Sequence, residues 1–248
     1  MYPPGTVDGC RDEVGQDGQV AEYRDPPGEV PWAMPIVVRV ERGNEPTAAA
    51  VAEAAATAVV RLLDDPRSAE GEWQSHVQRW LDGRIRKVAR RARGAQWDAA
   101  TELPGVTVEH AGAEVRAFVP GPTDAVPPQV AKLQVAGLDL EPGAPSSAAP
   151  GVLAVAITPL VAMSPLKAAV QVSHAAQLAH TTMAGTMAGT PTGAADLDSW
   201  RATGFGVRLV RPDADEWARL TASAQVVVRD AGFTEIPPDT QTAVALWS

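Results

Sequence analysis

The chain has 248 residues, of which 45% are apolar and 21% are charged, enough for one large domain or two small domains with buried cores. Thirty acidic and 21 basic residues give a net charge of −9, which argues against a protein that coats nucleic acid non-specifically but allows a local basic face. No run of about 18 uncharged apolar residues occurs, so we expect no membrane-spanning segment and no membrane partner.

The N-terminal residues indicate a cytoplasmic protein. The stretch MYPPGTVDGCRDEVG lacks the basic cap and the apolar run of a secretory signal, so we expect a cytoplasmic location. Cys10 is the only cysteine, which excludes an internal disulfide and a zinc site with four neighbouring Cys or His ligands.

The first half of the chain alternates between strand-like and helix-like segments. Residues 1–33 are rich in Pro, Gly, Asp and Glu, and we predict a mostly disordered lead-in. Residues 34–41 alternate as a strand. A helix is predicted over 46–63, because alanine favours helices, Pro46 suits the first helical position and Asn44 could cap it. The next predicted elements are a polar, Trp-bearing stretch at 72–83, a helix at 95–103 and a strand at 106–112.

The second half repeats this order. Ser164 and Pro165 predict the start of the helix PLKAAVQVSHAAQLAH, with serine as the cap and proline in the first turn. The other predicted elements are strands at 151–158, 205–211, 224–230 and 242–247 and a helix at 212–220.

Matching positions recur in the two halves at constant spacing. Trp80 and Trp97 match Trp200 and Trp217. The matching segments are PTAAAV at Pro46 with PLKAAV at Pro165, 106–112 with 226–232, and 127–136 with 237–245 after an insertion of roughly ten residues in the first half. Alanine-rich helices and valine-rich strands align with many sequences, but tryptophan pairs at equal spacing argue against chance.

We therefore predict an α/β protein made of two tandem copies of one small domain. The copies span 34–138 and 151–248, and a Pro-, Ser- and Gly-rich linker, 139–150, joins them. Each copy would hold strand, helix, strand, helix, strand, turn and strand around a largely parallel or mixed sheet. Two such copies could pack as an internal pseudo-dimer, and the whole chain could form a homodimer.

Common catalytic motifs are absent from the sequence. It contains no glycine-rich nucleotide loop, no HExxH and no GxSxG. The histidines, His76, His110, His174 and His180, are scattered, and the last two lie six residues apart, whereas helical metal pairs prefer three or four. We expect no metal and no cofactor.

One face of the helix that begins at Pro165 carries polar residues. Lys167, Gln171 and His174 recur at spacings of four and three, which places them on one face. Lys167 lies in the first turn, where the helix dipole disfavours a positive charge, so the pattern indicates an anionic ligand. The alternative is an ordinary solvated helix face. The same face of the first copy reads Ala48, Ala52 and Ala55.

A second polar cluster lies near the C-terminus. Asp230 ends a predicted strand, where α/β sheets often place ligand-binding groups, and Gly232 permits a tight turn. Thr234, Thr240 and Thr242 add hydroxyl groups on either side of a Pro-Pro break. As an alternative, Asp230 is a turn residue that bonds its own backbone. The first copy has His110 in place of Asp230 and Glu114 in place of Thr234.

These two clusters resemble the type II peptidyl-tRNA hydrolases. The segments KAAVQVSHAA and VVVRDAGFTEIPPDTQTAVAL carry the resemblance, which covers residues 152–247. It implies a small three-layer α/β/α domain with a four-stranded mixed sheet, without metal or cofactor. It also implies hydrolysis of the ester between a peptide and the 3′ ribose of tRNA, with the first copy as a degenerate relative.

The resemblance also assigns the site residues. It implies catalytic roles for Lys167, Asp230, Thr234 and Thr242, and polar substrate-binding roles for Gln171 and His174. Ester hydrolysis needs an oriented water and a cation or donor for the developing oxyanion, which suits these residue types. The loop at 158–166 contains no glycine, so a non-catalytic tRNA- or protein-binding relative stays an alternative, as does a hydrolase of another small ester or amide.

A basic segment of the first copy is predicted to bind tRNA. Clustered guanidinium groups near tryptophans suit an RNA backbone and stacked bases. The candidate substrate-binding arginines are Arg84, Arg86, Arg90 and Arg91, within a cluster that also includes Arg79, Lys87 and Arg93. A solvated surface that pairs with acidic residues elsewhere is an equal alternative.

Overall fold

The computed structural model describes residues 10–13, 25, 28–185, 193–232 and 234–247, and these residues form two mixed β-sheets with helices around them. The predicted α/β class is confirmed. The first sheet has the order β3-β2-β5-β4, with a short strand β6 beside β2. Its strands are β2 (Trp32–Arg39), β3 (Lys87–Ala92), β4 (Gly105–His110), β5 (Ala113–Phe118) and β6 (Gly121–Pro122).

The second sheet has the order β1-β9-β10-β7-β8. Its strands are β1 (Cys10–Glu13), β7 (Leu153–Ile157), β8 (Val207–Val210), β9 (Val226–Asp230) and β10 (Thr240–Leu246). In each sheet the first strand of the half runs parallel to the second (β2 with β3, β7 with β8). Strand β5 in the first sheet and strand β10 in the second run antiparallel to both of their neighbours. Apart from β1 and β6, the two sheets therefore share one topology.

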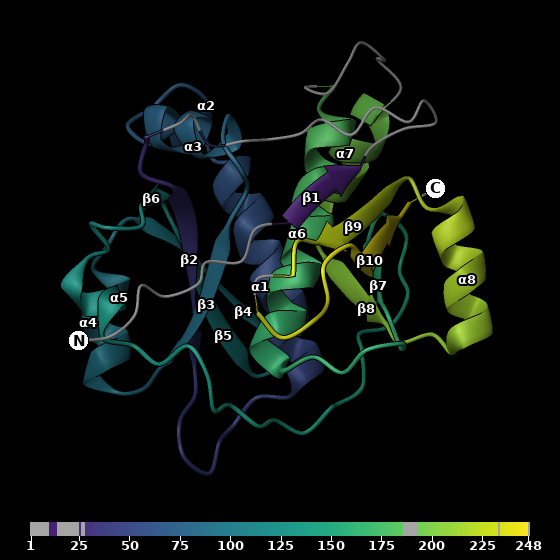
Figure 1. The fold of residues 1–248 in the computed structure, drawn as a ribbon, viewed down its shortest axis with the longest axis horizontal. Coiled ribbons are helices and arrows are strands. Elements are labelled where there is room, and N and C mark those ends of the chain that lie inside the picture. Colours follow the sequence, from purple (N-terminus) through teal and green to yellow (C-terminus); the bar gives the residue numbers. More distant parts are fainter. Residues whose placement is uncertain (1–9, 14–24, 26–27, 186–192, 233, 248) are drawn as a thin grey trace.

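Two long helices, α1 (Ala48–Leu63) and α6 (Pro165–Met183), pack against each other between the sheets (Figure 1). Both are buried on nearly all sides, and in α6 the buried residues include Lys167, Gln171 and His174. Each helix also reaches the other half: α1 contacts β8, and α6 contacts β3. A cluster of buried apolar side chains joins both helices to the inner faces of both sheets.

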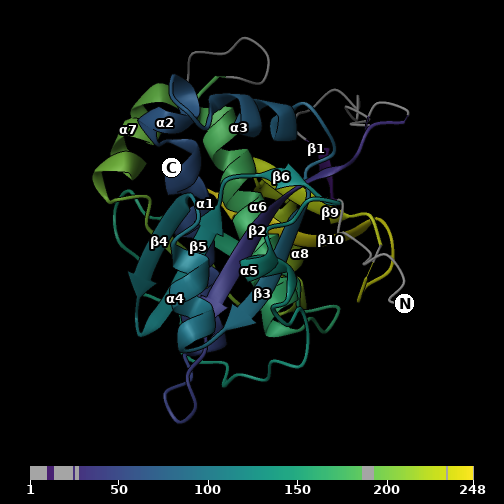
Figure 2. The ribbon, with the colours of Figure 1, turned by 90° about the vertical axis from the view of Figure 1, so that its left-hand side faces the viewer.

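Shorter helices cover the outer faces of the sheets (Figures 1 and 2). On the first sheet, α4 (Ala95–Thr101) packs through Trp97 beside α5 (Pro128–Ala131). On the second, α8 (Ala214–Ser223) packs through Trp217. The remaining helices are α2 (Pro66–Ala69), α3 (Gln74–Leu81) and α7 (Ala194–Ala202).

The paired tryptophans occupy equivalent places. Trp80 of α3 donates from Nε1 to the carbonyl of Arg86 at 2.9 Å, and Trp200 of α7 donates to the carbonyl of Gly206 at 2.8 Å. In both halves the acceptor lies six residues after the tryptophan, at the start of the strand that pairs in parallel. The equal spacing in the sequence thus corresponds to equal positions in the fold.

Helix caps follow the sequence in most places. Ser164 caps α6 as predicted, because its Oγ accepts from the backbone N–H of Lys167 at 3.2 Å. The predicted start of α1 was two residues early: Thr47, and not Asn44, is the cap, and its Oγ1 accepts from the N–H of Ala50 at 3.3 Å. Threonine supplies the acceptor at the position where the helical backbone begins.

The predicted match of 127–136 with 237–245 is wrong. Pro128–Ala131 form helix α5, whereas the strand equivalent to β10 is β5, which follows β4 after a turn at Ala111 and Gly112. The prolines favour the helix, because a proline cannot donate to a sheet ladder but suits the first turn of a helix. The longer connection is in the second half, between β9 and β10.

Parts of the predicted disordered lead-in are ordered. Cys10–Glu13 form β1, which pairs antiparallel with β9, and Trp32 and Ala33 belong to β2. The carboxylate of Asp25 accepts hydrogen bonds from Arg86. The rest of the predicted lead-in up to residue 24, and residues 26–27, lie outside the described residues.

Candidate functional site

The two predicted clusters of the second half meet. The ammonium Nζ of Lys167, in the first turn of α6, lies 2.7 Å from Oδ2 of Asp230 at the end of β9. The same ammonium donates to Oγ1 of the exposed Thr234 at 3.0 Å. Lys167 is 4% exposed and Asp230 is fully buried, so neither lies on a solvated helix face or surface turn. A buried pair of this kind must be well hydrogen-bonded to be tolerated.

Gln171 and the backbone of Gly232 also donate to Asp230, and Thr242 donates to Gln171. Gln171 donates from Nε2 to Asp230 Oδ2 at 2.8 Å, and Thr242 donates from Oγ1 to Gln171 Oε1 at 2.6 Å. The backbone N–H of Gly232 donates to Asp230 Oδ1 at 2.8 Å. Asp230 therefore bonds the backbone of its own turn, which was the alternative to a ligand-binding role, and it also pairs with Lys167. The four-residue spacing of Lys167 and Gln171 turns both side chains toward β9.

The connection between β9 and β10 is tied to the start of α6. Glu235 accepts from the backbone N–H of Ser164 at 2.8 Å and from its hydroxyl at 2.7 Å. Gly232 has a φ of +76°, and a Cβ there would lie 2.5 Å from the backbone nitrogen of Pro238. Glycine is thus required for this turn to bring Thr234 over Lys167.

His174, predicted to bind substrate, lies apart from the Lys167 cluster. Its Nδ1 is 2.9 Å from Nζ of Lys87, which reaches over from β3 of the first half. The Lys87 ammonium also donates to Oε1 of Gln177 at 2.5 Å. All three side chains are buried. The sequence placed Lys87 only in the basic cluster and did not predict its contact with His174. The one indication was that lysine is scarce, since Lys132 and Lys167 are the only others in the chain.

The predicted tRNA-binding arginines do not form one exposed surface. Arg86 is 7% exposed, and its guanidinium donates to Oδ1 of Asp25 at 2.8 Å; this hydrogen bond lowers the pKa of Asp25. Arg90 donates to the carbonyls of Ala131 at 3.2 Å and Leu133 at 3.0 Å, and burial lowers its pKa. Arg84 and Arg91 are half-buried. Arg84 and Arg86 precede β3, and Arg90 and Arg91 are neighbours on it, so their side chains point to opposite faces of the sheet.

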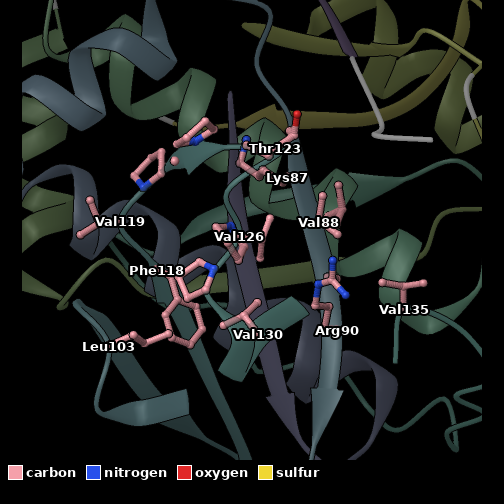
Figure 3. Close-up of a pocket in the computed structure, with 18 of the residues that line it drawn as sticks. Lys87, Val88, Arg90, Leu103, Phe118, Val119, Thr123, Val126, Val130 and Val135 are labelled. Carbon is pink, nitrogen blue, oxygen red and sulfur yellow. The ribbon is translucent and has the colours of Figure 1, made fainter. Parts of the chain in front are cut away.

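A pocket of about 890 Å³ lies between the two halves. Leu166, Lys167 and Val170 of α6 and Thr234 line it from the second half, and residues of β3, β5 and α5 line it from the first. Figure 3 shows part of the lining, including Lys87 and Arg90 of β3 with the apolar side chains around them. The Lys167–Thr234 contact therefore borders a concave and largely apolar space, as ligand sites commonly do.

The equivalent place in the first half is filled by the linker. His110, at the position of Asp230, has its Nε2 2.8 Å from Oε2 of Glu53 in α1 and 2.9 Å from the hydroxyl of Ser146. The backbone N–H groups of Ala48 and Ala49 donate to the carbonyls of Glu141 and Pro142. Linker carbonyls thus accept from the first backbone N–H groups of α1. At the start of α6, Lys167 and the pocket lie in that place.

Within the described ranges, no group of three or more His, Cys, Asp or Glu side chains could hold a metal ion. No helix in the same residues is long and apolar enough to cross a membrane. Comparison with known proteins found no matching family model, no matching curated protein and no matching solved structure.

Proposed function

We propose that this chain is a peptidyl-tRNA hydrolase-like enzyme, which cleaves the ester between a peptide, or an N-blocked amino acid, and the 3′ ribose of tRNA. The observation that carries the proposal is the contact of Lys167 with both Asp230 and Thr234 on the wall of the pocket. These residues are the ones that the sequence resemblance selects. Such an activity belongs to translation and to the cytoplasm.

The chemistry follows from the charges of the site. Water adds to the ester carbonyl carbon, the carbonyl oxygen becomes an oxyanion, and the bond to the ribose 3′ oxygen then breaks. Lys167 is the catalytic residue that stabilises the oxyanion, and Thr234 positions the substrate oxygen beside it. The proton lost by the water leaves with the ribose hydroxyl.

Asp230 is better suited to a positioning role than to proton abstraction. Its Oδ2 accepts from Lys167 and Gln171, and its Oδ1 accepts from the backbone of Gly232. A fully buried carboxylate with these donors favours the charged, fixed form of Lys167. Thr242 acts one step further out, because it orients Gln171.

We also infer that residues 34–138 and 151–248 arose by duplication and pack as an internal pseudo-dimer. The common strand order, the equivalent tryptophan hydrogen bonds and the packing of α1 on α6 support this inference. So does the reciprocal contact of α1 with β8 and of α6 with β3. In a twofold arrangement each such contact has a counterpart.

A second candidate is a non-catalytic tRNA- or protein-binding protein with the same fold. The burial of Lys167 and Asp230 favours it, since an occupied ion pair can be purely structural. Under this function the protein would bind tRNA and leave the ester intact.

The two candidates differ in one assay. We expect the full chain to release N-acetylated amino acid from N-acetyl-aminoacyl-tRNA above the rate without enzyme, and to leave uncharged tRNA unchanged. Binding of the same tRNA is measured in parallel by filter retention. Binding without release would support the second candidate and refute the first.

A further inference from the structure

The pocket beside Lys167 draws most of its wall from the first half of the chain. Its apolar lining includes Phe118, Val126 and Val130, which Figure 3 shows facing a common space. The contribution of the second half is the start of α6 and the turn at Thr234 and Glu235. A ligand that reacts at Lys167 and extends into the pocket must therefore contact both halves.

The pocket also carries buried hydrogen-bond donors. Trp73 is 3% exposed, and its indole Nε1 has no hydrogen-bond partner among the described residues. The same holds, within that part of the chain, for Nε of Arg90, which lines the pocket as well. Buried N–H groups without partners are costly and uncommon in native proteins. Because these two atoms have almost no accessible surface, they do not face the open space of the pocket, and the class of ligand follows from the rest of the lining.

The lining separates two classes of ligand group. The cations of the lining already have partners in the protein: Lys167 pairs with Asp230, Lys87 contacts His174 and Gln177, and Arg90 donates to backbone carbonyls. A phosphate would also meet the carboxylates of Glu72 and Glu235 and a mostly apolar wall. A peptide offers carbonyl oxygens as acceptors and apolar side chains for the wall. The volume of about 890 Å³ lies in the range of pockets that enclose drug-sized ligands, which a short acylated peptide resembles in size.

We propose that this pocket binds the acyl part of the ester, so that the first half of the chain selects peptides whose last residue has a large apolar side chain. This inference rests on the proposed function. The tRNA body stays outside, and the ester carbonyl lies at Lys167. The first copy has no lysine equivalent to Lys167. Its role is to form the wall of the pocket that selects the substrate of the second copy.

Binding of non-hydrolysable analogues tests the pocket without turnover. The probes are the N-acetyl-phenylalanyl and N-acetyl-glycyl amides of 3′-amino-3′-deoxyadenosine, measured by calorimetry with the full chain. We expect the phenylalanyl analogue to bind about tenfold more tightly or better, the scale of apolar side-chain discrimination. Equal affinity for the two analogues would overturn the proposal.

Pocket-filling variants place the preference in the first half. Val126→Trp removes space from the pocket and should abolish the preference, whereas Ala222→Trp, on the exposed surface of α8, should retain it. Val88→Trp on β3 repeats the test if Val126→Trp does not fold by circular dichroism. Retention of the preference in a folded filled variant would refute the pocket assignment.

Hydrolysis separates this inference from the proposed function. With N-acetyl-Phe-tRNA and N-acetyl-Gly-tRNA, the wild type should show the same preference in kcat/KM, and the filled variant should lose it. Selective binding without hydrolysis would uphold the pocket and refute the activity. Hydrolysis of both esters at equal kcat/KM, unaffected by the filled variant, would uphold the activity and refute the pocket.

Discussion

The two halves of the chain share one topology but use the same place differently. In the second half, the first turn of α6 holds Lys167, which pairs with Asp230 at the border of an open pocket. In the first half, Ala50 is the equivalent residue, because its backbone N–H donates to the cap of α1 as that of Lys167 does to the cap of α6, and the linker bonds to the start of the helix. The second half has a charged pair beside a ligand-sized space, and the first half has contacts within the protein at the same place.

The carboxylate of Glu53 is the centre of the hydrogen bonds that the first half makes at this place. It is 1% exposed and accepts from the backbone of Leu209 in β8 at 2.8 Å and of Ser146 in the linker at 3.0 Å. Burial opposes its charge, but hydrogen bonds from His110, Ser146 and Leu209 outweigh burial and lower the pKa of Glu53. The place equivalent to the site in the second half thus joins β4, the linker and the second sheet, which is a structural task.

The largest effect is expected from Asp230→Asn. This change removes the carboxylate of Asp230 from the buried Lys167 ammonium, so we expect a loss of about 3–5 kcal/mol in the free energy of unfolding. Ester hydrolysis should fall about 100-fold or more, because Lys167 loses its fixed position. Denaturant titration and the release assay measure both, with the exposed Asp124→Asn as the matched control. Unchanged stability would show that Asp230 does not stabilise the buried charge of Lys167.

Glu53→Gln should affect stability alone. The amide cannot accept from all the donors around Glu53, so we expect a loss of about 1–3 kcal/mol in the free energy of unfolding. Hydrolysis by the folded protein should match the wild type. The exposed Glu109→Gln on β4 is the control. A large fall in kcat without loss of stability would contradict the structural role.

The contribution of Glu53 should depend on pH with a known sign. Because its pKa is lower in the folded state, the carboxylate stabilises the fold fully above its unfolded pKa of about 4.3 and loses this contribution as the pH falls through the folded pKa. The difference in stability between wild type and Glu53→Gln should therefore shrink on acidification from pH 6 toward about pH 3. A constant difference over that range would argue against an ionised Glu53.

Ser146→Ala is the smallest test of the comparison. It removes a 2.6 Å hydrogen bond from the linker hydroxyl to Glu53, and we expect a loss of about 0.5–1.5 kcal/mol in the free energy of unfolding. The neighbouring, exposed Ser147→Ala should change nothing measurable. Equal effects of the two substitutions would show that the linker is not held through Ser146.

Local patterns predicted most elements of the fold. Alternating apolar residues marked the strands, and Ser164 with Pro165 marked the start of α6. The proline pair at Pro127 gives a false match with the last strand, because similar residues do not show which backbone N–H groups a strand must donate. The order in Cys10–Glu13 depends on pairing with β9, which no local composition reveals.

The candidate site was predictable only within one half. The helix spacing and the resemblance selected Lys167, Asp230 and Thr234, which the fold brings together. Lys87 reaches His174 across the interface between the halves, and Arg86 is neutralised by Asp25 from far along the chain. Contacts of this kind depend on how distant segments pack together. The spacing of residues within one helix or strand does not predict that packing.

The most direct test compares Lys167→Met with Lys132→Met in the hydrolysis of N-acetyl-aminoacyl-tRNA under single-turnover conditions. Lys132 is exposed, so its substitution controls for the loss of one positive charge. An ammonium that stabilises the oxyanion predicts a fall of about 100-fold or more for Lys167→Met and a wild-type rate for Lys132→Met. Hydrolysis by folded Lys167→Met at the wild-type rate would contradict the assignment of the site.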